Sequence, residues 1–380
     1  MVLEDGSVFR GESVGAEGEW VGEVVFNTSM TGYQEIITDP SYWGQMVVFT
    51  CPHIGNVGVN PEDVESRQPY LRAVIAREIC ATPSNWRAQQ PLPEYLQAAG
   101  VPALSGIDTR RLTLILREKG TLRAALSTVN HDVDRLTQMA QNAPDMSTQA
   151  AVPAVSADGS QVWEQSVPST WVPLVGGHGE TPDEAPHIVV VDCGVKHNIL
   201  RLLVQCGAAV TVVPWQSDAE AIMALAPDGV LLSNGPGDPE QVNATIETVR
   251  GLTGRVPIFG ICLGHQVIGL AAGARKYKLP FGHHGGNHPV KALSSGQVEI
   301  TAQNHNYAID AESLADLPYV ATHINLYDGT LEGMRHRELP IWSVQFHPEA
   351  SPGPHDSVHI IREFVNSLSA QEVSCPSEQT

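Results

Sequence analysis

The chain has 380 residues, of which 42% are apolar and 17% charged, and its formal net charge at pH 7 is −20. This composition is typical of a soluble globular protein, and the length favours two or three domains. The negative charge argues against nucleic acid or an anionic membrane surface as a partner. No cationic, apolar leader follows Met1 and no apolar run reaches transmembrane length, so we expect a cytoplasmic protein.

Short strands and turns dominate the first sixty residues. Val2 to Phe9 is predicted to form a hairpin around an Asp-Gly turn. Strands are also predicted at residues 23–26, 45–50, 71–78 and 122–126. The segments between the early strands, 30–42 and 51–58, are rich in turn-forming residues, and we interpret them as loops.

Residues 108–120 have the signals of a complete helix. Asp108 is placed to cap its N-terminus, and Leu112 and Leu116 share one face. Gly120 is expected to end it in the left-handed conformation, and a second helix is predicted at 132–141. Strands and helices without regular alternation predict an α+β domain over residues 1–150.

Proline, serine, glycine and acidic residues dominate residues 144–186, where we place the domain junction. The segment 151–186 is interpreted as a connecting arm. Trp163 and Trp171 lie within it, which favours an arm packed against a domain.

From His187 onward, strands and helices alternate. Apolar strands are predicted at 187–192, 209–213, 229–233 and 256–261, with helices at 196–205, 218–226 and 239–252 between them. This order predicts a doubly wound parallel sheet, a flavodoxin-like α/β arrangement, whose ligands bind beyond the carboxyl ends of the strands.

A cysteine lies at the end of the last of these strands. Gly260-Ile-Cys-Leu-Gly264 joins the strand to a helical pattern that ends at Gly273. A nucleophile on a sharp turn between strand and helix is the geometry of a nucleophile elbow, and flanking glycines avoid collisions there. The helix N-terminus favours a thiolate at Cys262.

A base and an acid are predicted further along the chain. The apolar strand 341–346 ends at His347, and Glu349 lies two residues on, where an extended chain places both side chains on one side. Together with Cys262 they predict a Cys-His-Glu catalytic triad. The N–H of Leu263 and the glycine-rich turn at Gly235 are candidates for an oxyanion hole.

Three motifs resemble those of class I glutamine amidotransferase domains: residues 260–266, 234–239 and 346–349. Four further stretches resemble the small, glutaminase subunits of carbamoyl-phosphate synthases: residues 31–42, 52–58, 281–290 and 347–356. The resemblance implies an amidotransferase domain over 187–369 and a partner-contacting N-terminal domain over 1–150. Residues 370–380 are interpreted as a polar tail.

The resemblance also implies the roles of individual residues. The nucleophile of the family corresponds to Cys262, the base to His347 and the acid to Glu349. The family's positions for binding L-glutamine correspond to Ser41, Gly235, Gly237, Leu263, Gln266, Asn304, Asn306 and Tyr307. The sequence departs from many relatives at Asn306-Tyr307, where they have Gly-Phe, and at Cys51, where they often have an aromatic residue.

The same resemblance implies a heteromeric enzyme. A large subunit would take ammonia and form carbamoyl phosphate from bicarbonate and ATP, for pyrimidine or arginine biosynthesis or both. We expect no cofactor in this chain, and ATP and Mg²⁺ in the partner, because no Walker-type loop is present here.

Other histidines have spacings that resemble those of metal ligands or bases. His283, His284 and His288 are assigned to a structural loop, and no metal site is expected. His355 and His359 are interpreted as solvated residues of a helix that begins near Pro354. The six cysteines show no metal-type spacing, which indicates reduced thiols; they are Cys51, Cys80, Cys193, Cys206, Cys262 and Cys375.

Three other functions are compatible with parts of this pattern. A glutaminase or γ-glutamyl hydrolase serving another enzyme would lack the segments between Thr31 and Gly58. A binding subunit with a relic site would not need an intact triad. A cysteine peptidase would leave the glutamine-pocket segments unexplained.

Overall fold

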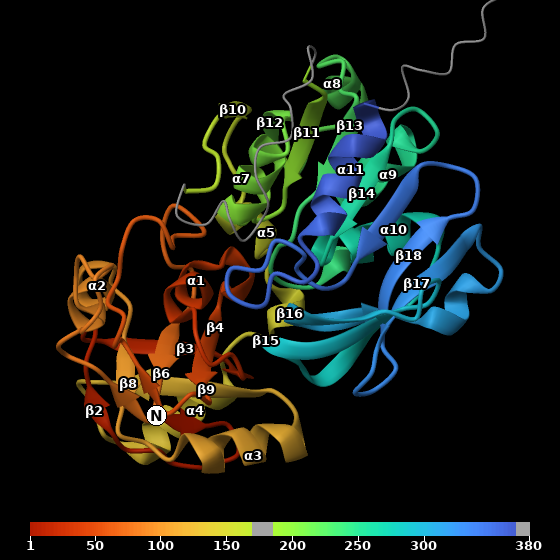
Figure 1. The fold of residues 1–380 in the computed structure, drawn as a ribbon. Helices are drawn as coiled ribbons and strands as arrows, with labels where there is room; N and C mark the ends of the chain where they lie inside the picture. The colour runs from red at the N-terminus through yellow and green to blue at the C-terminus, as the bar shows by residue number, and fades with distance from the viewer. Residues whose placement is uncertain (169–184, 370–380) are drawn as a thin grey trace, which may run out of the picture.

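The computed structural model describes residues 1–168 and 185–369. These residues form two lobes, each built around a β-sheet, with the N-terminal lobe below and the C-terminal lobe above it (Figure 1). Among the described helices, none has the length and apolar character needed to cross a membrane.

The N-terminal lobe contains a seven-stranded mixed sheet in the order β1-β9-β3-β4-β6-β8-β2. Its strands are β1 (Val2–Leu3), β2 (Glu12–Ser13), β3 (Glu19–Asn27), β4 (Gln45–Phe49), β6 (Ala73–Ile75), β8 (Ala103–Ser105) and β9 (Leu122–Ser127). A separate pair joins β5 (His53–Ile54) to β7 (Glu78–Ile79). The helices are α1 (Tyr33–Thr38), α2 (Leu92–Ala98), α3 (Thr109–Lys119) and α4 (Val133–Gln141), with 3₁₀ turns η1 (Pro40–Tyr42) and η2 (Met146–Thr148).

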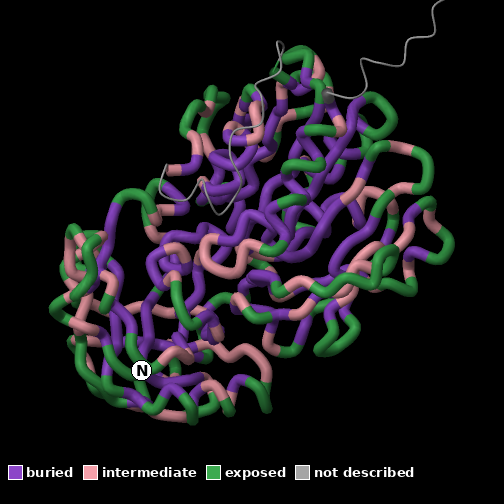
Figure 2. Tube along the Cα trace, in the orientation of Figure 1, coloured by how far each residue is buried: buried purple, intermediate pink, exposed green. Residues whose placement is uncertain are grey.

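Strand alternation divides the core of this lobe into two layers. Val47 and Phe49 of β4 pack with α1 and α2, whereas Met46 and Val48 pack with Leu112 of α3 on the opposite face. These four residues of β4 are buried, and Figure 2 shows the buried residues of this lobe in purple. The sheet therefore packs against α1, and Asp39 in the turn after α1 contacts Asn304 of the second lobe.

Several expectations for this lobe are wrong in detail. Residues 71–78 do not form one strand, because β6 joins the main sheet and β7 pairs with β5. The segment 30–42, interpreted as a loop, contains α1 and η1. Asp108 caps α3 as predicted, but Gly120 has φ 87° and ψ −173°, so it is not in the left-handed helical conformation. The hairpin and the helix 133–141 are confirmed.

The C-terminal lobe contains a ten-stranded sheet in the order β10-β12-β11-β13-β14-β19-β18-β17-β15-β16. Its strands are β10 (Gln161–Trp163), β11 (His187–Asp192), β12 (Ala209–Pro214), β13 (Gly229–Leu232), β14 (Ile258–Ile261), β15 (Lys276–Ala292), β16 (Val298–Ile309), β17 (Tyr319–Asn325), β18 (Leu331–His336) and β19 (Ile341–Val344). The helices are α5 (Val152–Val155), α7 (His197–Gln205), α8 (Ala219–Met223), α9 (Asn243–Leu252), α10 (Leu263–Ala272) and α11 (His359–Ser369), with 3₁₀ turns η3 (Pro239–Gln241) and η4 (Ala311–Leu314).

The predicted doubly wound parallel sheet is confirmed. Strands β12, β11, β13, β14 and β19 are parallel neighbours. Buried residues of α7 and α11 pack on one face, and those of α9 and α10 on the other. Antiparallel strands extend this sheet on both sides, a feature that the alternating pattern did not predict.

The register of the parallel strands brings the ends of β14 and β19 together. Gly260 pairs with Ser343 and Ile261 with Val344, so residues that follow the two strands meet at one edge. Cys262 follows β14, and His347 follows β19.

Three expectations for the second lobe need correction. Residues 239–252 form η3 and α9 separately, because Val242 between them leaves the helical conformation. Helix α11 begins at His359, so His355 lies before the helix. His283, His284 and His288 lie in strand β15, not in a loop. The arm packs against this lobe at Trp163, as expected, because β10 pairs with β12, whereas Trp171 falls outside the described residues.

The two lobes are joined by polar contacts between buried groups. The N–H of Thr28 donates to the carbonyl of His284 at 3.1 Å. Asn304 Nδ2 donates to Asp39 Oδ2 at 2.7 Å, and the N–H of Asn198 donates to Glu65 Oε2 at 3.0 Å. The lobes therefore form one continuous interface at the edge where Cys262 lies.

Candidate active site

Cys262 occupies a strained turn between β14 and α10. Its backbone has φ 55° and ψ −102°, outside the regions that ordinary residues favour. The side chain is buried, and Leu263 is the first residue of the helix. Because the first N–H groups of a helix lack intrahelical acceptors, they are directed toward an anion at this position.

The glycines on either side of Cys262 are required by contacts. A Cβ atom on Gly264 would lie 2.2 Å from the carbonyl oxygen of Leu232. One on Gly260 would lie 2.7 Å from the carbonyl group of Gly264. The prediction that side chains would collide at this turn is confirmed.

His347 lies in a chain of polar contacts that ends in a buried lysine. Its Nδ1 is 2.6 Å from Glu349 Oε1, and that oxygen accepts from Lys196 Nζ at 2.9 Å. All three side chains are at most 2% exposed. His347 Nε2 has no hydrogen-bond partner among the described residues, so it is the nitrogen that is free to exchange a proton.

The charges of Lys196, Glu349 and His347 stabilise one another. Burial by itself would lower the pKa of His347, but the negative charges of Glu349 and the Cys262 sulfur raise it to about 10. Burial would raise the pKa of Glu349, but the charges of Lys196 and His347 lower it to about 2. Glu349 is thus held as a carboxylate and His347 as a cation.

Seven of the eight predicted glutamine-binding residues line one narrow pocket beside Cys262. Gln45 and Glu23 of the first lobe also line it. The predicted residues in its wall are Ser41, Gly235, Gly237, Gln266, Asn304, Asn306 and Tyr307. The eighth, Leu263, follows Cys262 directly at the start of α10. The structure therefore brings the predicted nucleophile and the predicted pocket together.

Both lobes fix the polar groups of this pocket. Ser41, in η1 of the first lobe, accepts a hydrogen bond at its Oγ from Asn234 Nδ2 at 2.9 Å. Asn304 contacts Asp39 through Nδ2, and its Oδ1 is 2.9 Å from His284 Nδ1. A small molecule bound here would touch residues from both lobes, a common position for ligand sites.

The departure at Asn306-Tyr307 is accommodated by the first lobe. Asn306 Nδ2 donates to Glu23 Oε2 at 3.3 Å, and its Oδ1 is 3.1 Å from His284 Nε2. The Tyr307 carbonyl accepts from Gln266 Nε2 at 2.7 Å. The backbone of Tyr307 therefore keeps a defined position in the pocket without a glycine before it.

Gly235 is the predicted second donor of the oxyanion hole, and its place is sterically fixed. A Cβ there would lie 2.1 Å from the carbonyl oxygen of Cys193 and 2.8 Å from Leu263 Cδ2. The turn that contains Gly235 thus packs directly on the residue that follows the nucleophile. This contact leaves no room for another residue type.

Gly235→Ala is expected to lower kcat for glutamine hydrolysis by about 10²–10³-fold, because the turn must move and carry its N–H away. KM should change much less than kcat. Gly159→Ala is the matched control, since nothing lies within 4 Å of a Cβ at that position. Steady-state assays of glutamate release check both variants, and a kcat within threefold of the unchanged chain would argue against this role.

Three polar residues of the site were not predicted. Lys196 contacts Glu349, and Asn198 Nδ2 donates to the Glu349 carbonyl at 2.6 Å. Gln345 Nε2 is 3.6 Å from Cys262 Sγ, and Gln345 lies in the predicted strand 341–346 just before His347, which could have indicated it. Lys196 and Asn198 follow β11, so their place at the strand ends was the one available signal.

A second histidine, His265, follows Gly264 in helix α10. His265 is fully buried, its Nδ1 is 2.9 Å from Ser343 Oγ, and burial lowers its pKa to about 3. It is a neutral core residue, consistent with assigning the base role to His347. His359 is half-exposed and contacts Glu299 and Glu363 on the surface.

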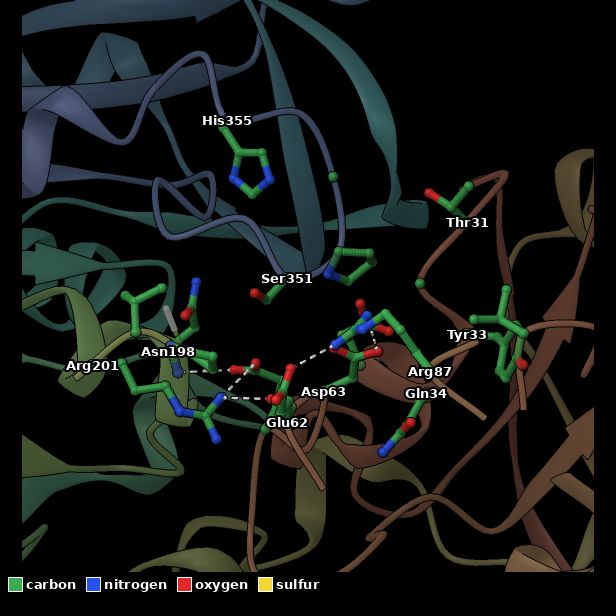
Figure 3. A pocket seen from close by; sticks show the side chains of 18 of the residues that line it. Thr31, Tyr33, Gln34, Glu62, Asp63, Arg87, Asn198, Arg201, Ser351 and His355 are labelled. Carbon is green, nitrogen blue, oxygen red and sulfur yellow. Dashed lines mark hydrogen bonds and ion pairs between the residues drawn. The ribbon is translucent and has the colours of Figure 1, made fainter. Parts of the chain in front are cut away.

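A larger pocket, of about 280 Å³, lies elsewhere between the lobes (Figure 3). Arg87 pairs with Asp63 at 2.7 Å, and Arg201 lies 3.6 Å from Glu65. Burial, followed by the charge of Asp63, raises the pKa of Glu35 on its wall to about 8. No cysteine is among the described residues that line it, so we place the candidate active site at Cys262 despite the smaller volume there.

Comparison with known proteins identifies the class of the second lobe. Residues 189–367 match the family described as glutamine amidotransferase class-I. Residues 1–126 match the family described as carbamoyl-phosphate synthase small chain, CPSase domain. A crystal structure of a protein described as a GMP synthase subunit, from Thermoplasma acidophilum, covers 50% of this chain and 99% of its own, at 24% identity and a TM-score of 0.43.

Relatives extend over the whole chain. The carbamoyl phosphate synthase small chain of Aquifex aeolicus is 53% identical over 365 residues, covering 96% of this chain and 97% of its own. That of Thermosynechococcus vestitus is 51% identical over 382 residues, covering 100% and 98%. The chain belongs to the carbamoyl-phosphate synthase small chain family and contains a class-I glutamine amidotransferase domain.

Proposed function

We propose that this chain hydrolyses L-glutamine with Cys262, His347 and Glu349 as its catalytic triad. The Cys262 sulfur attacks the side-chain amide carbon, and the N–H groups of Leu263 and Gly235 stabilise the resulting oxyanion. His347 then donates a proton to the leaving nitrogen, the C–N bond breaks, and ammonia and a thioester remain. Water then attacks the thioester and gives a proton to His347, the C–S bond breaks, and glutamate leaves the Cys262 thiolate.

The observation that carries this proposal is the position of Cys262. It lies on a strained turn at a helix N-terminus, next to a pocket that both lobes line. His347 is held by Glu349 with Nε2 unpaired among the described residues. A nucleophile, an oriented base and polar groups for an amino-acid substrate are the components that this chemistry needs.

We further propose that ammonia passes to a large partner subunit in a cytoplasmic heterodimer or a higher assembly. The relatives' name, small chain, supports such a partner. That subunit would hold ATP and Mg²⁺ and form carbamoyl phosphate from bicarbonate for pyrimidine or arginine biosynthesis, or both. The N-terminal domain is the proposed contact surface.

The test combines the chain with the large chain from the same source. Carbamoyl phosphate formation is measured with glutamine and, separately, with ammonium chloride as the nitrogen source. A glutamine analogue with an electrophilic ketone is then added, and the labelled residue is identified by mass spectrometry. We expect a label on Cys262, loss of glutamine-dependent synthesis and retention of ammonia-dependent synthesis.

Two results would contradict the proposal. A label on another cysteine, with Cys262 unmodified, would remove the assigned nucleophile. Failure of the two chains together to use glutamine, while ammonia is used, would show that glutamine hydrolysis does not feed the partner. Cys206→Ala is the control for labelling, because Cys206 is a partly buried thiol at the end of α7.

A further inference from the structure

Two histidines and a glutamate converge in the strands behind the proposed glutamine pocket. His283 belongs to β15, His305 to β16 and Glu332 to β18, the strands that extend the C-terminal sheet in Figure 1. Their exposed fractions are 6%, 5% and 0%. One nitrogen of each imidazole and one oxygen of Glu332 lie within 4.8 Å of one another. The proposed reaction uses none of these three side chains.

One nitrogen in this cluster is buried without a partner. His283 Nδ1 makes no hydrogen bond with any described residue, and the nearest carboxylate oxygen, Glu332 Oε1, is 3.7 Å away. The other nitrogen, Nε2, is 2.9 Å from Asp328 Oδ2. An unpaired buried nitrogen costs free energy, and an occupant of the space between the two side chains would offset that cost.

His305 has two acceptors around a ring that carries one N–H. Its Nδ1 is 2.8 Å from the Tyr307 carbonyl oxygen and its Nε2 is 3.0 Å from Gln303 Oε1. With the proton on Nδ1, the lone pair of Nε2 faces an oxygen, an arrangement that a cation at Nε2 would relieve.

The outer contacts of the three residues are those that metal ligands make. A ligating histidine usually donates its second N–H to a carboxylate or a backbone carbonyl, as His283 does to Asp328 and His305 to Tyr307. Glu332 is held at both oxygens: Oε1 accepts from Asn325 at 2.9 Å and Oε2 from Gln303 at 2.9 Å. These contacts leave His283 Nδ1 without a hydrogen bond among the described residues, whereas His305 Nε2 would exchange Gln303 Oε1 for the metal.

We propose that His283 Nδ1, His305 Nε2 and Glu332 bind one divalent transition-metal ion, with Zn²⁺ as the best match to two imidazoles and a carboxylate. Ligand atoms around tetrahedral zinc lie about 3.3 Å apart for bonds of 2.0–2.1 Å, so small side-chain rotations close the site. A water molecule completes the shell. The exposed turn at Tyr327 and Asp328 provides the entry path.

Such a metal would brace the wall of the glutamine pocket. His305 lies between Asn304 and Asn306 in β16, and all three residues line the pocket. A metal that joins β15, β16 and β18 would fix the strand that carries them. We therefore assign the ion a structural role, outside the reaction.

Zinc binding by the full chain tests this assignment. Cys262→Ala is introduced throughout, so that the active-site thiol does not bind the metal. After treatment with a chelator, the chain is titrated with ZnCl₂ by calorimetry, and we expect one ion per chain. Glu332→Gln should weaken binding by at least about 100-fold, and Asn325→Ala, which removes an outer contact, by about 10–100-fold.

His359→Gln is the matched control, because His359 contacts two glutamates on the surface and should leave the affinity unchanged. Anomalous diffraction at the zinc edge locates the ion without any change to the cluster, which separates a lost site from a misfolded variant. A zinc peak between His283 and Glu332 supports the assignment. The assignment would be overturned by a zinc peak elsewhere, by the absence of a retained ion, or by an equal loss of zinc affinity in His359→Gln and Glu332→Gln. A buried hydrogen-bond network would then explain the cluster.

Discussion

Replacing Cys262 by alanine is expected to lower glutamine hydrolysis by a factor on the order of 10⁴–10⁶, the range for loss of a catalytic nucleophile or its partner. The thiol is the atom that forms the covalent bond, and none of the other described groups in the pocket can replace it. Alanine removes only Sγ and leaves the turn, the pocket and His347 in place. The measurement is glutamate release by the chain with its partner.

Ammonia-dependent synthesis by the same complex should stay within about twofold of its original rate, because the change lies outside the partner's chemistry. Cys206→Ala serves as the control for removal of a thiol from the same domain. Hydrolysis by Cys262→Ala within tenfold of the original rate would exclude Cys262 as the nucleophile. A parallel loss of ammonia-dependent activity would instead indicate a damaged interface between the two chains.

The central sheet of the second lobe was predictable because its signals are local. Residues 187–192 and 256–261 are continuous apolar runs, and buried parallel strands produce that pattern. The helix after the second run ends at a recognisable glycine, Gly273, with φ 96° and ψ 11°. Order along the chain then determines which strands are parallel.

Helix α1 was missed because tertiary packing overrides its local preference. Ile36, Ile37 and Thr38 favour strands, and Gly32 before the helix offers no side-chain cap. The helix forms because Ile36 and Ile37 are buried against the first sheet. This contact depends on distant strands, so no window of sequence could indicate it.

Strand β15 was missed for a different reason. Its pairing with β16 is shifted twice, between Lys278 and His283 and between Gly285 and His288. Each irregularity changes which face a side chain occupies, so the alternation that predicts a strand is lost. Gly285 and Gly286 between the shifts also resemble a loop in sequence.

The candidate site shows the same division between local and distant information. Cys262, His347 and Glu349 belong to compact motifs and could be proposed directly. Lys196 contacts Glu349 across 153 positions of sequence, and a lysine at the start of a helix is usually solvated. Its burial follows from the meeting of β11 and the segment after β19, which only the assembled sheet creates.

Lys196→Met is expected to lower the free energy of unfolding by about 3–5 kcal/mol, because it breaks a buried ion pair and leaves His347 as the one cation that contacts Glu349 among the described residues. Lys196 is 2% exposed and Glu349 is not exposed at all. The variant also loses the hydrogen bond from Nζ to the Ala350 carbonyl at 2.5 Å. Urea unfolding at pH 7, monitored by circular dichroism, measures the difference in free energy of unfolding between the variant and the original chain.

The pH dependence distinguishes a charge effect from a packing effect. In the original chain the pKa of Glu349 is lowered to about 2, so its contribution to stability is full above pH 4.5 and is lost as the pH falls through 2. Without Lys196, burial raises the pKa of this carboxyl, and its contribution no longer appears at neutral pH. The variant and the original chain should therefore differ more at pH 7 than at pH 3.

The rate of glutamine hydrolysis by Lys196→Met should also fall, because Glu349 orients His347 through a contact of 2.6 Å. A displacement of about 1 Å at His347 would lower kcat by about 10²-fold. The double variant Lys196→Met, Glu349→Gln removes both charges, and we expect it to unfold at a higher urea concentration than Lys196→Met alone. If the two changes instead destabilise the chain additively, Lys196 acts through packing of its side chain, and the ion pair does not hold the catalytic carboxylate.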